Sequence, residues 1–372
     1  MVLVRDPLYG VIEVEDEFLD ILDNPYFQRL RHIKQDALLF YVYPSAKHDR
    51  FSHSLGTYHL MRQVVEHSMK DISPEDAFAL KAAALLHDIG HGPYSHMWEH
   101  LVDGFDHEVM SVKIITEEFD LPKVAAIVEK KHPLYPLLSS VIDVDKLDYM
   151  ARDSYFCGVG YGYTDVERIV RYLSVQDGKL CVSPKIFTSV EHVIMSRINL
   201  YKSTYFHHSV IIKDVLMKNI FKRAKKLFLD GEGIYVDELF AHFLKGKGTV
   251  DEFLLLDDSV IEFHMNKWRS EKDEILADLV ARFFSRKGFG SLNVLFDDVD
   301  VKAIKADVAK VYDTDYYFAD FNINKGVYEN EAYVVKSDGT LTPLSELSEH
   351  IAGIIKTPIT KRFIIAPKEF LK

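Results

Sequence analysis

The sequence predicts a mostly α-helical body followed by a small C-terminal lobe of mixed α and β structure. Apolar residues recur at helical spacing through most of residues 1–230, whereas short β-rich runs separated by turn signals follow after about residue 300. The chain has 372 residues, of which 48% are hydrophobic and 27% are charged, so it can bury a sizeable core. We therefore expect two parts, residues 1–230 and residues 231–372.

Helix start signals can be placed along the first part. Asn24 is a candidate N-cap before Pro25, and apolar residues at three-residue spacing predict one face of a helix over residues 26–34. Ser73 is expected to cap a buried helix over residues 74–86, which is rich in Ala and Leu. Further helices are expected over residues 108–118, 122–130, 144–153 and 188–226.

Strand and turn signals predict β structure in two places. The run 173–175 faces the run 180–182 across Asp177-Gly178, which predicts a hairpin with a type I′ turn. In the C-terminal lobe we expect a turn at Asp338-Gly339 and a helix over residues 343–355. The β-rich runs expected there cover residues 303–311, 316–321, 332–335 and 362–365.

Charge and cysteine content limit the classes of partner. Lys and Arg number 45 and Asp and Glu number 57, giving a net charge of −12, so strong nucleic-acid binding is not expected, although a local basic pocket can hold a small anion. Cys157 and Cys181 are the only cysteines, which favours a reducing compartment without disulfides. No signal-peptide pattern or 18-residue apolar stretch is present, so we expect a cytoplasmic protein without a membrane span.

The central chemical signal is the pair His87-Asp88 at the end of the predicted buried helix. An imidazole beside a carboxylate supplies two metal ligands, and a buried Asp needs a compensating charge. Together with His53 and Asp145 the pair offers two nitrogens and two carboxylate oxygens, which suits one divalent ion with open positions for catalysis. A capping role for Asp88 is the structural alternative.

Three polar side chains share one face of the helix expected over residues 144–153. Asp145, Tyr149 and Asp153 lie at i, i+4 and i+8, while Leu147 and Met150 supply the apolar stripe. A solvated helix face is the alternative to a binding function for these residues.

Five sequence motifs, which occur in the same order as in a known protein family, indicate a resemblance to that family. The chain resembles the HD-domain deoxynucleoside triphosphate (dNTP) triphosphohydrolases, which include the bacterial deoxyguanosine triphosphohydrolases and the HD domain of the vertebrate sterile-alpha-motif enzyme. The matching strings are DPLYG (6–10), FQRLRHIKQ (27–35), RFSHSLG (50–56), LHDIGHGPYSH (86–96) and IDVDKLDYMARD (142–153). The segment 200–208 matches more weakly, and the C-terminal third matches only loosely. The resemblance implies an HD-type helical core.

The resemblance also implies the reaction and its central residues. By this resemblance, His53, His87, Asp88 and Asp145 are expected to hold one divalent metal ion, which the sequence does not identify among Mn, Mg, Fe, Ni and Zn. In the family, water attacks the α-phosphorus, and the deoxynucleoside and intact triphosphate leave. The residues implied around the α-phosphate are His91, His96, His107, Glu99, Glu108 and Asp88. Which histidine is the general acid is left open, and His91 or His107 can equally be an ordinary core histidine.

Seven positions match substrate contacts of the family. Arg50, Lys146 and Arg197 match cations that contact the phosphates. Gln35 and Asp153 match groups that hold the sugar 3′-hydroxyl, and Tyr149 belongs to the same deoxynucleoside pocket. Tyr205 matches the aromatic residue that crowds C2′, although core packing also explains an aromatic residue there.

The sequence departs from the family pattern in two places. Asp36-Ala37 follow Lys34-Gln35 where the family commonly has Leu-Gly, so the wall beside the sugar differs, and Ser52 replaces a frequent Glu.

Regulation, assembly and competing functions also follow from the resemblance. Asp23, Gln28 and Arg31 match residues that bind a regulatory guanine nucleotide, whereas a surface pair between Arg31 and Asp23 explains them structurally. Family members are commonly dimers or tetramers, so a homo-oligomer is expected. The alternatives to dNTP hydrolysis are hydrolysis of another nucleotide phosphoester, such as a nucleoside monophosphate or an alarmone, and nucleotide sensing without turnover.

Overall fold

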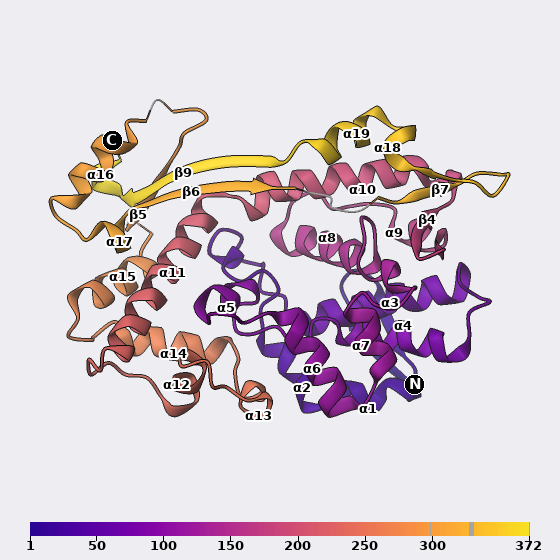
Figure 1. The fold of residues 1–372 in the computed structure, drawn as a ribbon, viewed down its shortest axis with the longest axis horizontal. Helices are drawn as coiled ribbons and strands as arrows, with labels where there is room; N and C mark the ends of the chain where they lie inside the picture. The colour runs from indigo at the N-terminus through magenta and orange to yellow at the C-terminus, as the bar shows by residue number, and fades with distance from the viewer. Residues whose placement is uncertain (287, 298, 327–330, 372) are drawn as a thin grey trace.

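The computed structural model describes residues 1–286, 288–297, 299–326 and 331–371. In Figure 1 most of the helices lie below, and two long strands, β6 (Ala319–Lys325) and β9 (Ile359–Pro367), run along the upper left, in line with α10 (Phe187–Leu200) to their right. The mostly α-helical fold with C-terminal strands that the sequence predicts is therefore confirmed.

The chain begins with an antiparallel hairpin of β1 (Val2–Asp6) and β2 (Gly10–Val14), and short helical turns follow. Asn24 caps α2 (Pro25–Gln28) as expected, because its side chain accepts a hydrogen bond from the Tyr26 amide. The single helix expected over residues 26–34 is wrong: α2 passes into a 3₁₀ turn, and the extended backbone of Ile33 ends it. The remaining turns here are η1 (Asp16–Phe18), α1 (Leu19–Leu22), η2 (Arg29–His32) and η3 (Leu39–Tyr41).

Three helices form the centre of the first part and carry most of the site. They are α3 (Arg50–His67), α4 (Pro74–Leu86) and α8 (Val144–Cys157). α4 has the expected bounds, and Ser73 caps it by accepting from the Asp76 amide. Helix α3 packs closely on α8 at Gly56, where a Cβ atom would overlap the Asp148 carboxylate. Around them lie α5 (His96–Leu101), α6 (His107–Phe119), α7 (Pro122–Val128) and η4 (Tyr135–Leu137).

The middle of the chain contains the expected hairpin and a broken helix. β3 (Leu173–Gln176) pairs with β4 (Lys179–Val182), and Asp177 and Gly178 both have positive φ, as a type I′ turn requires. The continuous helix expected over residues 188–226 is wrong: α10 and α11 (His208–Leu229) are separated by a π-helical turn, η6 (Tyr201–Tyr205). His207 is extended and caps α11 by accepting from the Ser209 amide. The neighbouring elements are α9 (Val166–Val170), η5 (Pro184–Ile186), α12 (Glu238–Leu244), α13 (Val250–Leu254), α14 (Asp258–Trp268) and α15 (Glu274–Phe284).

The C-terminal strands form one sheet of their own and extend another. β9 lies between β5 (Phe289–Asn293) and β6, antiparallel to both. β7 (Tyr333–Val335) pairs in parallel with β4 and carries β8 (Leu341–Pro343), so this lobe adds two strands to the earlier hairpin. The helical elements are α16 (Val301–Ala309), α17 (Thr314–Tyr317), α18 (Leu344–Leu347), α19 (Glu349–Lys356) and η7 (Lys368–Phe370).

The β-rich run expected over residues 303–311 is wrong, because α16 covers most of it. The Asp300 side chain accepts a hydrogen bond from the Ala303 amide and caps this helix. Ile304 and Val308 are four residues apart, so they share one face of α16, and Val308 is fully buried. Of the expected run 316–321, residues 319–321 belong to β6, residues 316–317 belong to α17, and Phe318 is the extended residue between them. The strands expected over residues 332–335 and 362–365 and the turn at Asp338-Gly339 are confirmed.

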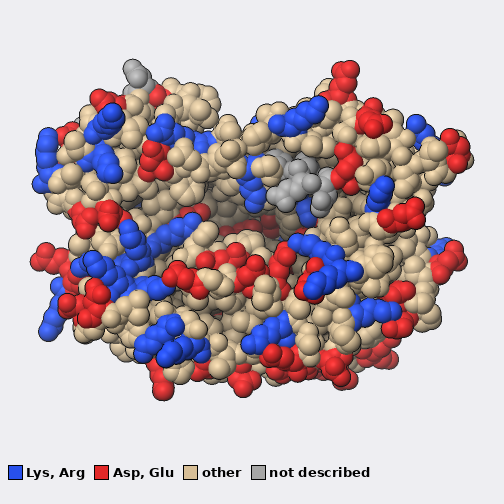
Figure 2. Space-filling view, in the orientation of Figure 1, with Lys and Arg blue, Asp and Glu red and all other residues tan. Residues whose placement is uncertain are grey.

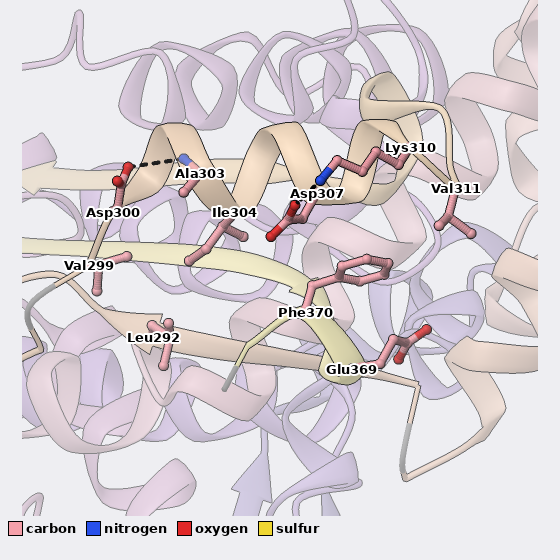
Figure 3. A pocket seen from close by; sticks show the side chains of 10 residues that line it. All are labelled: Leu292, Val299, Asp300, Ala303, Ile304, Asp307, Lys310, Val311, Glu369 and Phe370. Carbon is pink, nitrogen blue, oxygen red and sulfur yellow. Dashed lines mark hydrogen bonds and ion pairs between the residues drawn. The ribbon is translucent and has the colours of Figure 1, made fainter.

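One continuous hydrophobic core runs from Ile12 to Ala366 and crosses the boundary expected after residue 230. Among the described residues, no helix is both long and apolar enough to cross a bilayer. A hollow of about 520 Å³ in the C-terminal lobe lies between α16 and β5, and Phe370 lines it (Figure 3). None of the candidate site residues predicted from the sequence lines it.

Candidate functional site

The four residues expected to hold a metal come together from three helices. His53 lies in α3, His87 and Asp88 follow the last turn of α4, and Asp145 lies in the first turn of α8. His53 Nε2 is 3.1 Å from Asp145 Oδ1 and 3.6 Å from Asp88 Oδ2. His87 Nε2 is 3.5 Å from Asp88 Oδ1 and 3.8 Å from Asp145 Oδ1. Side chains up to 92 residues apart in sequence thus form one compact group of possible ligands. We call these four residues the metal group.

Hydrogen bonds to the outer ring nitrogens orient both imidazoles. His53 Nδ1 lies 2.8 Å from Asp148 Oδ2, and His87 Nδ1 lies 3.0 Å from the Ala84 carbonyl oxygen. Each Nδ1 therefore donates its proton outward, and each Nε2 faces the carboxylates of the group. Both Nε2 atoms are buried without a hydrogen-bond partner. Two imidazole nitrogens beside two carboxylates fit a divalent ion, which would displace any proton held on Nε2.

Opposite charges control the ionisation of this group. Burial alone would raise the pKa of Asp88, but Arg50 and His87 outweigh it and hold this pKa well below its usual range. Burial lowers the pKa of His53, whereas Asp145 and Asp148 raise it to about 10. Arg50 forms a buried ion pair with Asp88 and donates from Nε to Ser95 Oγ at 2.7 Å. Arg50, expected at a phosphate, thus lies directly against the metal group.

Three histidines and one glutamate form a second cluster beside the first. The rings of His91 and His107 stack with centroids 3.9 Å apart, and His96 meets both rings edge-on. Glu99 Oε1 lies 3.2 Å from His96 Nδ1 and 2.5 Å from His107 Nδ1. Burial, Arg50 and His107 hold the pKa of His91 well below its usual value, so His91 is neutral at pH 7. His96 is the exposed member, with 67% of its side chain accessible.

The structure does not bring Glu108 into this cluster. Its carboxylate pairs with Lys130 at 2.8 Å, and both side chains are largely exposed. Because Glu108 is the second residue of α6, its side chain projects in a different direction from that of His107. Glu99 provides the carboxylate that contacts the histidines.

A third cluster surrounds Asp153, the residue expected at the sugar, and we call it the sugar cluster. The Tyr205 hydroxyl donates to Asp153 Oδ2 at 2.5 Å, and His48 Nε2 lies 2.9 Å from Asp153 Oδ1. Asp36 Oδ2 is 3.3 Å from the same His48 nitrogen. Burial, together with the Asp36 charge, raises the pKa of Asp153 to about 6. Gln35 Oε1 is buried without a hydrogen-bond partner, so it can accept from a ligand hydroxyl.

The remaining expected substrate residues lie on α8 and α10. Lys146 Nζ donates to Asp143 Oδ2 at 2.7 Å and is 14% exposed. The Arg197 guanidinium lies 5.5 Å from the centre of the Tyr201 ring. Burial raises the pKa of Tyr149 although Arg197 opposes this, so the phenol stays protonated. Figure 2 shows a hollow near the middle of the drawn face, with acidic side chains at its floor.

The residues expected at a regulatory nucleotide lie on the surface near α2. Gln28 Nε2 donates to the Leu22 carbonyl at 2.6 Å, and Arg31 Nε donates to Gln28 Oε1 at 2.8 Å. The Arg31 guanidinium also stacks over the Phe51 ring at 3.5 Å. Asp23 is exposed, and the polar partner of Arg31 here is Gln28.

Sequence reasoning missed two buried carboxylates that position the site. Asp148 accepts from the Tyr9 hydroxyl, from His53 and from two nitrogens of Arg152. Its i, i+4 spacing to Arg152 was the available signal. Asp258, at the start of α14, accepts from the Lys34 amide at 3.1 Å and from the Tyr94 amide at 2.6 Å. Tyr94 and Asp258 are 164 residues apart, and no local sequence pattern predicts a contact over that separation.

Asp258 holds two segments that lead into the site. Lys34 precedes Gln35, and Tyr94 and Ser95 precede His96. Tyr94 and Ser95 both have φ of 55°, in the left-handed region that L-residues with a side chain rarely adopt. The Asp258 carboxylate satisfies the Tyr94 amide in this strained turn and thereby supports the backbone before His96.

The geometry defines a helical protein with a His/Asp group that could hold a metal ion beside a histidine cluster. The chain belongs to the HD-domain family: the family model for the HD domain matches residues 50–153, and that for the HD associated region matches residues 164–360. Both the metal group and the histidine cluster lie within residues 50–153, whereas Asp258 lies in the associated region.

Relatives and solved structures place the chain among the HD-domain phosphohydrolases. It is 34% identical to the uncharacterized protein YwfO of Bacillus subtilis, over 77% of this chain and 70% of that protein. It is 30% identical to the deoxynucleoside triphosphate triphosphohydrolase SAMHD1 of Homo sapiens, over 60% of this chain but only 45% of that protein. A phosphohydrolase from Bacteroides thetaiotaomicron matches with a TM-score of 0.89 and 28% identity, over 98% of this chain and 99% of that chain.

We predict that His53→Ala and Asp145→Ala each lose bound metal, because each removes one of four protein ligands. Loss of an outer-sphere partner typically costs 10–100-fold in metal affinity, and loss of a ligand should cost at least as much. Elemental analysis of the purified variants measures this, with His32→Ala, an exposed histidine, as the matched control. Full metal occupancy in either variant would remove that residue from the ligand set.

We predict that Asp258→Ala lowers the free energy of unfolding by about 3–5 kcal/mol, because it leaves Lys34 and the Tyr94 amide without their buried partner. Glu262→Ala is the matched control, since Glu262 also pairs with Lys34 but is 49% exposed. Glu262→Ala should lower the free energy of unfolding by less than about 1 kcal/mol. Urea unfolding of both variants measures the difference, and equal losses would show that Asp258 has no special positioning role.

Proposed function

We propose that the protein is a metal-dependent dNTP triphosphohydrolase that cleaves its substrate at the α-phosphate into a deoxynucleoside and triphosphate. The observation that carries this proposal is the shared Asp88 carboxylate. One oxygen lies 3.6 Å from His53 Nε2, and the other lies 3.5 Å from His87 Nε2 and 3.4 Å from His91 Nε2. A phosphate bound there contacts both the metal group and the histidine cluster. The named activity of the human relative supports the same substrate class.

The proposed roles follow from the hydrogen bonds. Bound at His53, His87, Asp88 and Asp145, a divalent ion supplies Lewis-acid polarisation of the phosphate and its attacking water. The water oxygen bonds to the α-phosphorus and gives up one proton, the bond from phosphorus to O5′ breaks, and O5′ takes one proton, so the proton count balances. Glu99 accepts from His96 Nδ1, so His96 presents Nε2 to solvent and is our candidate proton donor. His91, whose lowered pKa keeps it neutral, and His107 are proposed to flank the phosphate.

The sugar is proposed to bind at Asp153. Tyr205 and His48 already use both of its oxygens, but a carboxylate has about four acceptor positions, so it can still accept from a 3′-hydroxyl. Gln35 supplies a second acceptor, and Tyr149 and Tyr205 supply aromatic walls. Lys146 and Arg197 are the proposed contacts of the outer phosphates. A guanine nucleotide at Asp23, Gln28 and Arg31, and a homo-oligomeric assembly, are further parts of the proposal.

The proposed activity is tested by incubating the protein with each of the four dNTPs and Mn²⁺ or Mg²⁺ and measuring inorganic triphosphate. We predict release of triphosphate by the wild type, and a loss of about 10²–10⁴-fold in His96→Ala with metal content unchanged. Turnover by His96→Ala within threefold of wild type would exclude His96 as the proton donor. Hydrolysis of monophosphates alone would contradict the proposed substrate.

Selectivity for deoxyribose is the prediction that tests the sugar pocket. If Tyr205 fills the space beside C2′, an added 2′-hydroxyl costs about 2–4 kcal/mol in strain and lost hydrogen bonding. The ratio of kcat/KM for dGTP over GTP should then be roughly 30 to 1000, and Tyr205→Ala should reduce it. Lys146→Ala is the control, because it should weaken both nucleotides alike. Equal rates for dGTP and GTP in the wild type would contradict the sugar pocket.

A further inference from the structure

A cavity of about 540 Å³ between α5 and α11 carries four lysines. Lys218, Lys222, Lys225 and Lys226 line it from α11, and His100 and Leu101 line it from the end of α5. None of its lining residues belongs to the metal group, the histidine cluster or the sugar cluster. Helix α5 nevertheless connects the two regions, since His96 is its first residue.

The lysines form a stripe along one side of α11. Positions i, i+4, i+7 and i+8 share one helix face, and eight residues at 1.5 Å rise span about 12 Å. Figure 2 shows basic side chains gathered over the region of α11, to the left of the central hollow. In a chain with a net charge of −12, this is a local concentration of positive charge.

Nearby acidic groups offset only part of this charge. Asp103 pairs with Lys225 at 2.6 Å, but its side chain is 90% exposed. Burial raises the pKa of Asp214, one turn before Lys218, to about 7, so this carboxyl is only partly ionised at neutral pH. Lys222 Nζ donates to the Asp315 carbonyl at 3.3 Å, which is a neutral acceptor. The cavity therefore keeps an excess of positive charge.

Two titratable groups that line the cavity have lowered pKa values. Burial lowers the pKa of Lys218, and burial together with the Lys218 charge lowers the pKa of His100. Burial disfavours the charged form of both groups, and at His100 the neighbouring Lys218 charge adds to this effect. A bound anion would supply the missing counter-charge.

We propose that this cavity binds a compact polyphosphate group, carried either by inorganic triphosphate or by a nucleoside triphosphate. Four ammonium groups within about 12 Å match several adjacent phosphates better than one. The cavity volume lies in the range of about 300–1,000 Å³ that is typical of small-molecule sites. Buried Leu101 and Phe221 offer an apolar floor. A long nucleic acid would extend beyond the four lysines onto the surface of a net acidic protein. Charge repulsion there disfavours a nucleic acid as the ligand.

Lysine acetylation of the intact protein, analysed by mass spectrometry, locates the bound anion. With inorganic triphosphate we expect at least threefold protection of Lys218, Lys222 and Lys226, and none of Lys131, an exposed lysine that pairs with Glu129. A parallel arm with dGTP shows whether a nucleoside adds to the protection. Protection confined to Lys146 would place the anion only at the proposed active site and would overturn this inference. Stronger protection of these three lysines by a single-stranded DNA oligonucleotide than by inorganic triphosphate would also overturn the inference.

Calorimetric titration with inorganic triphosphate tests the same site by affinity. The double variant Lys218→Gln/Lys222→Gln should weaken the affinity for triphosphate at this site at least tenfold. Lys222→Gln alone changes an exposed side chain without threatening the fold, and should weaken it at least threefold. Lys131→Gln/Lys310→Gln removes the same charge from exposed positions and should bind like wild type. Equal affinity in the two double variants would overturn the inference.

Discussion

The fully buried Asp148 carboxylate is the interaction on which the metal group depends. It accepts from His53 Nδ1 at 2.8 Å, from Arg152 Nε and Nη2 at 2.9 Å and from the Tyr9 hydroxyl at 2.9 Å. Arg152 in turn donates to Asp6 at 2.8 Å, so the N-terminal hairpin, α3 and α8 meet at one charge network. Because a buried carboxylate is costly without such partners, the network fixes how the two helices pack. Gly56 permits that close approach.

This packing determines which nitrogen His53 offers to a ligand. With Nδ1 engaged by Asp148, Nε2 must face Asp88 and Asp145, and the Ala84 carbonyl imposes the same orientation on His87. The centre is therefore organised before any ion binds, at the cost of two buried nitrogens without partners. Asp258 plays a comparable role from the associated region by supporting the strained turn before His96. The site thus draws on both parts of the chain.

Much of the helical body and the grouping of the candidate ligands could be predicted from sequence, because caps and short motifs are local signals. Ser73 and the 74–86 pattern predict α4 with its observed bounds. Most of the β-rich run expected over residues 303–311 is helical instead, because the i, i+4 spacing of Ile304 and Val308 gives α16 one apolar face despite the β-branched side chains. Contacts such as those of Asp258 span 164 residues or more, and no local pattern encodes them.

Anomalous diffraction from crystals soaked in Mn²⁺ tests the central claim most directly, because it locates the ion rather than its effects. The account predicts one strong peak bounded by His53 Nε2, His87 Nε2, Asp88 and Asp145, with His53 Nδ1 still bonded to Asp148. No peak there, or a peak bound instead by His48 with Asp36 and Asp153, which also lie close together, would contradict it.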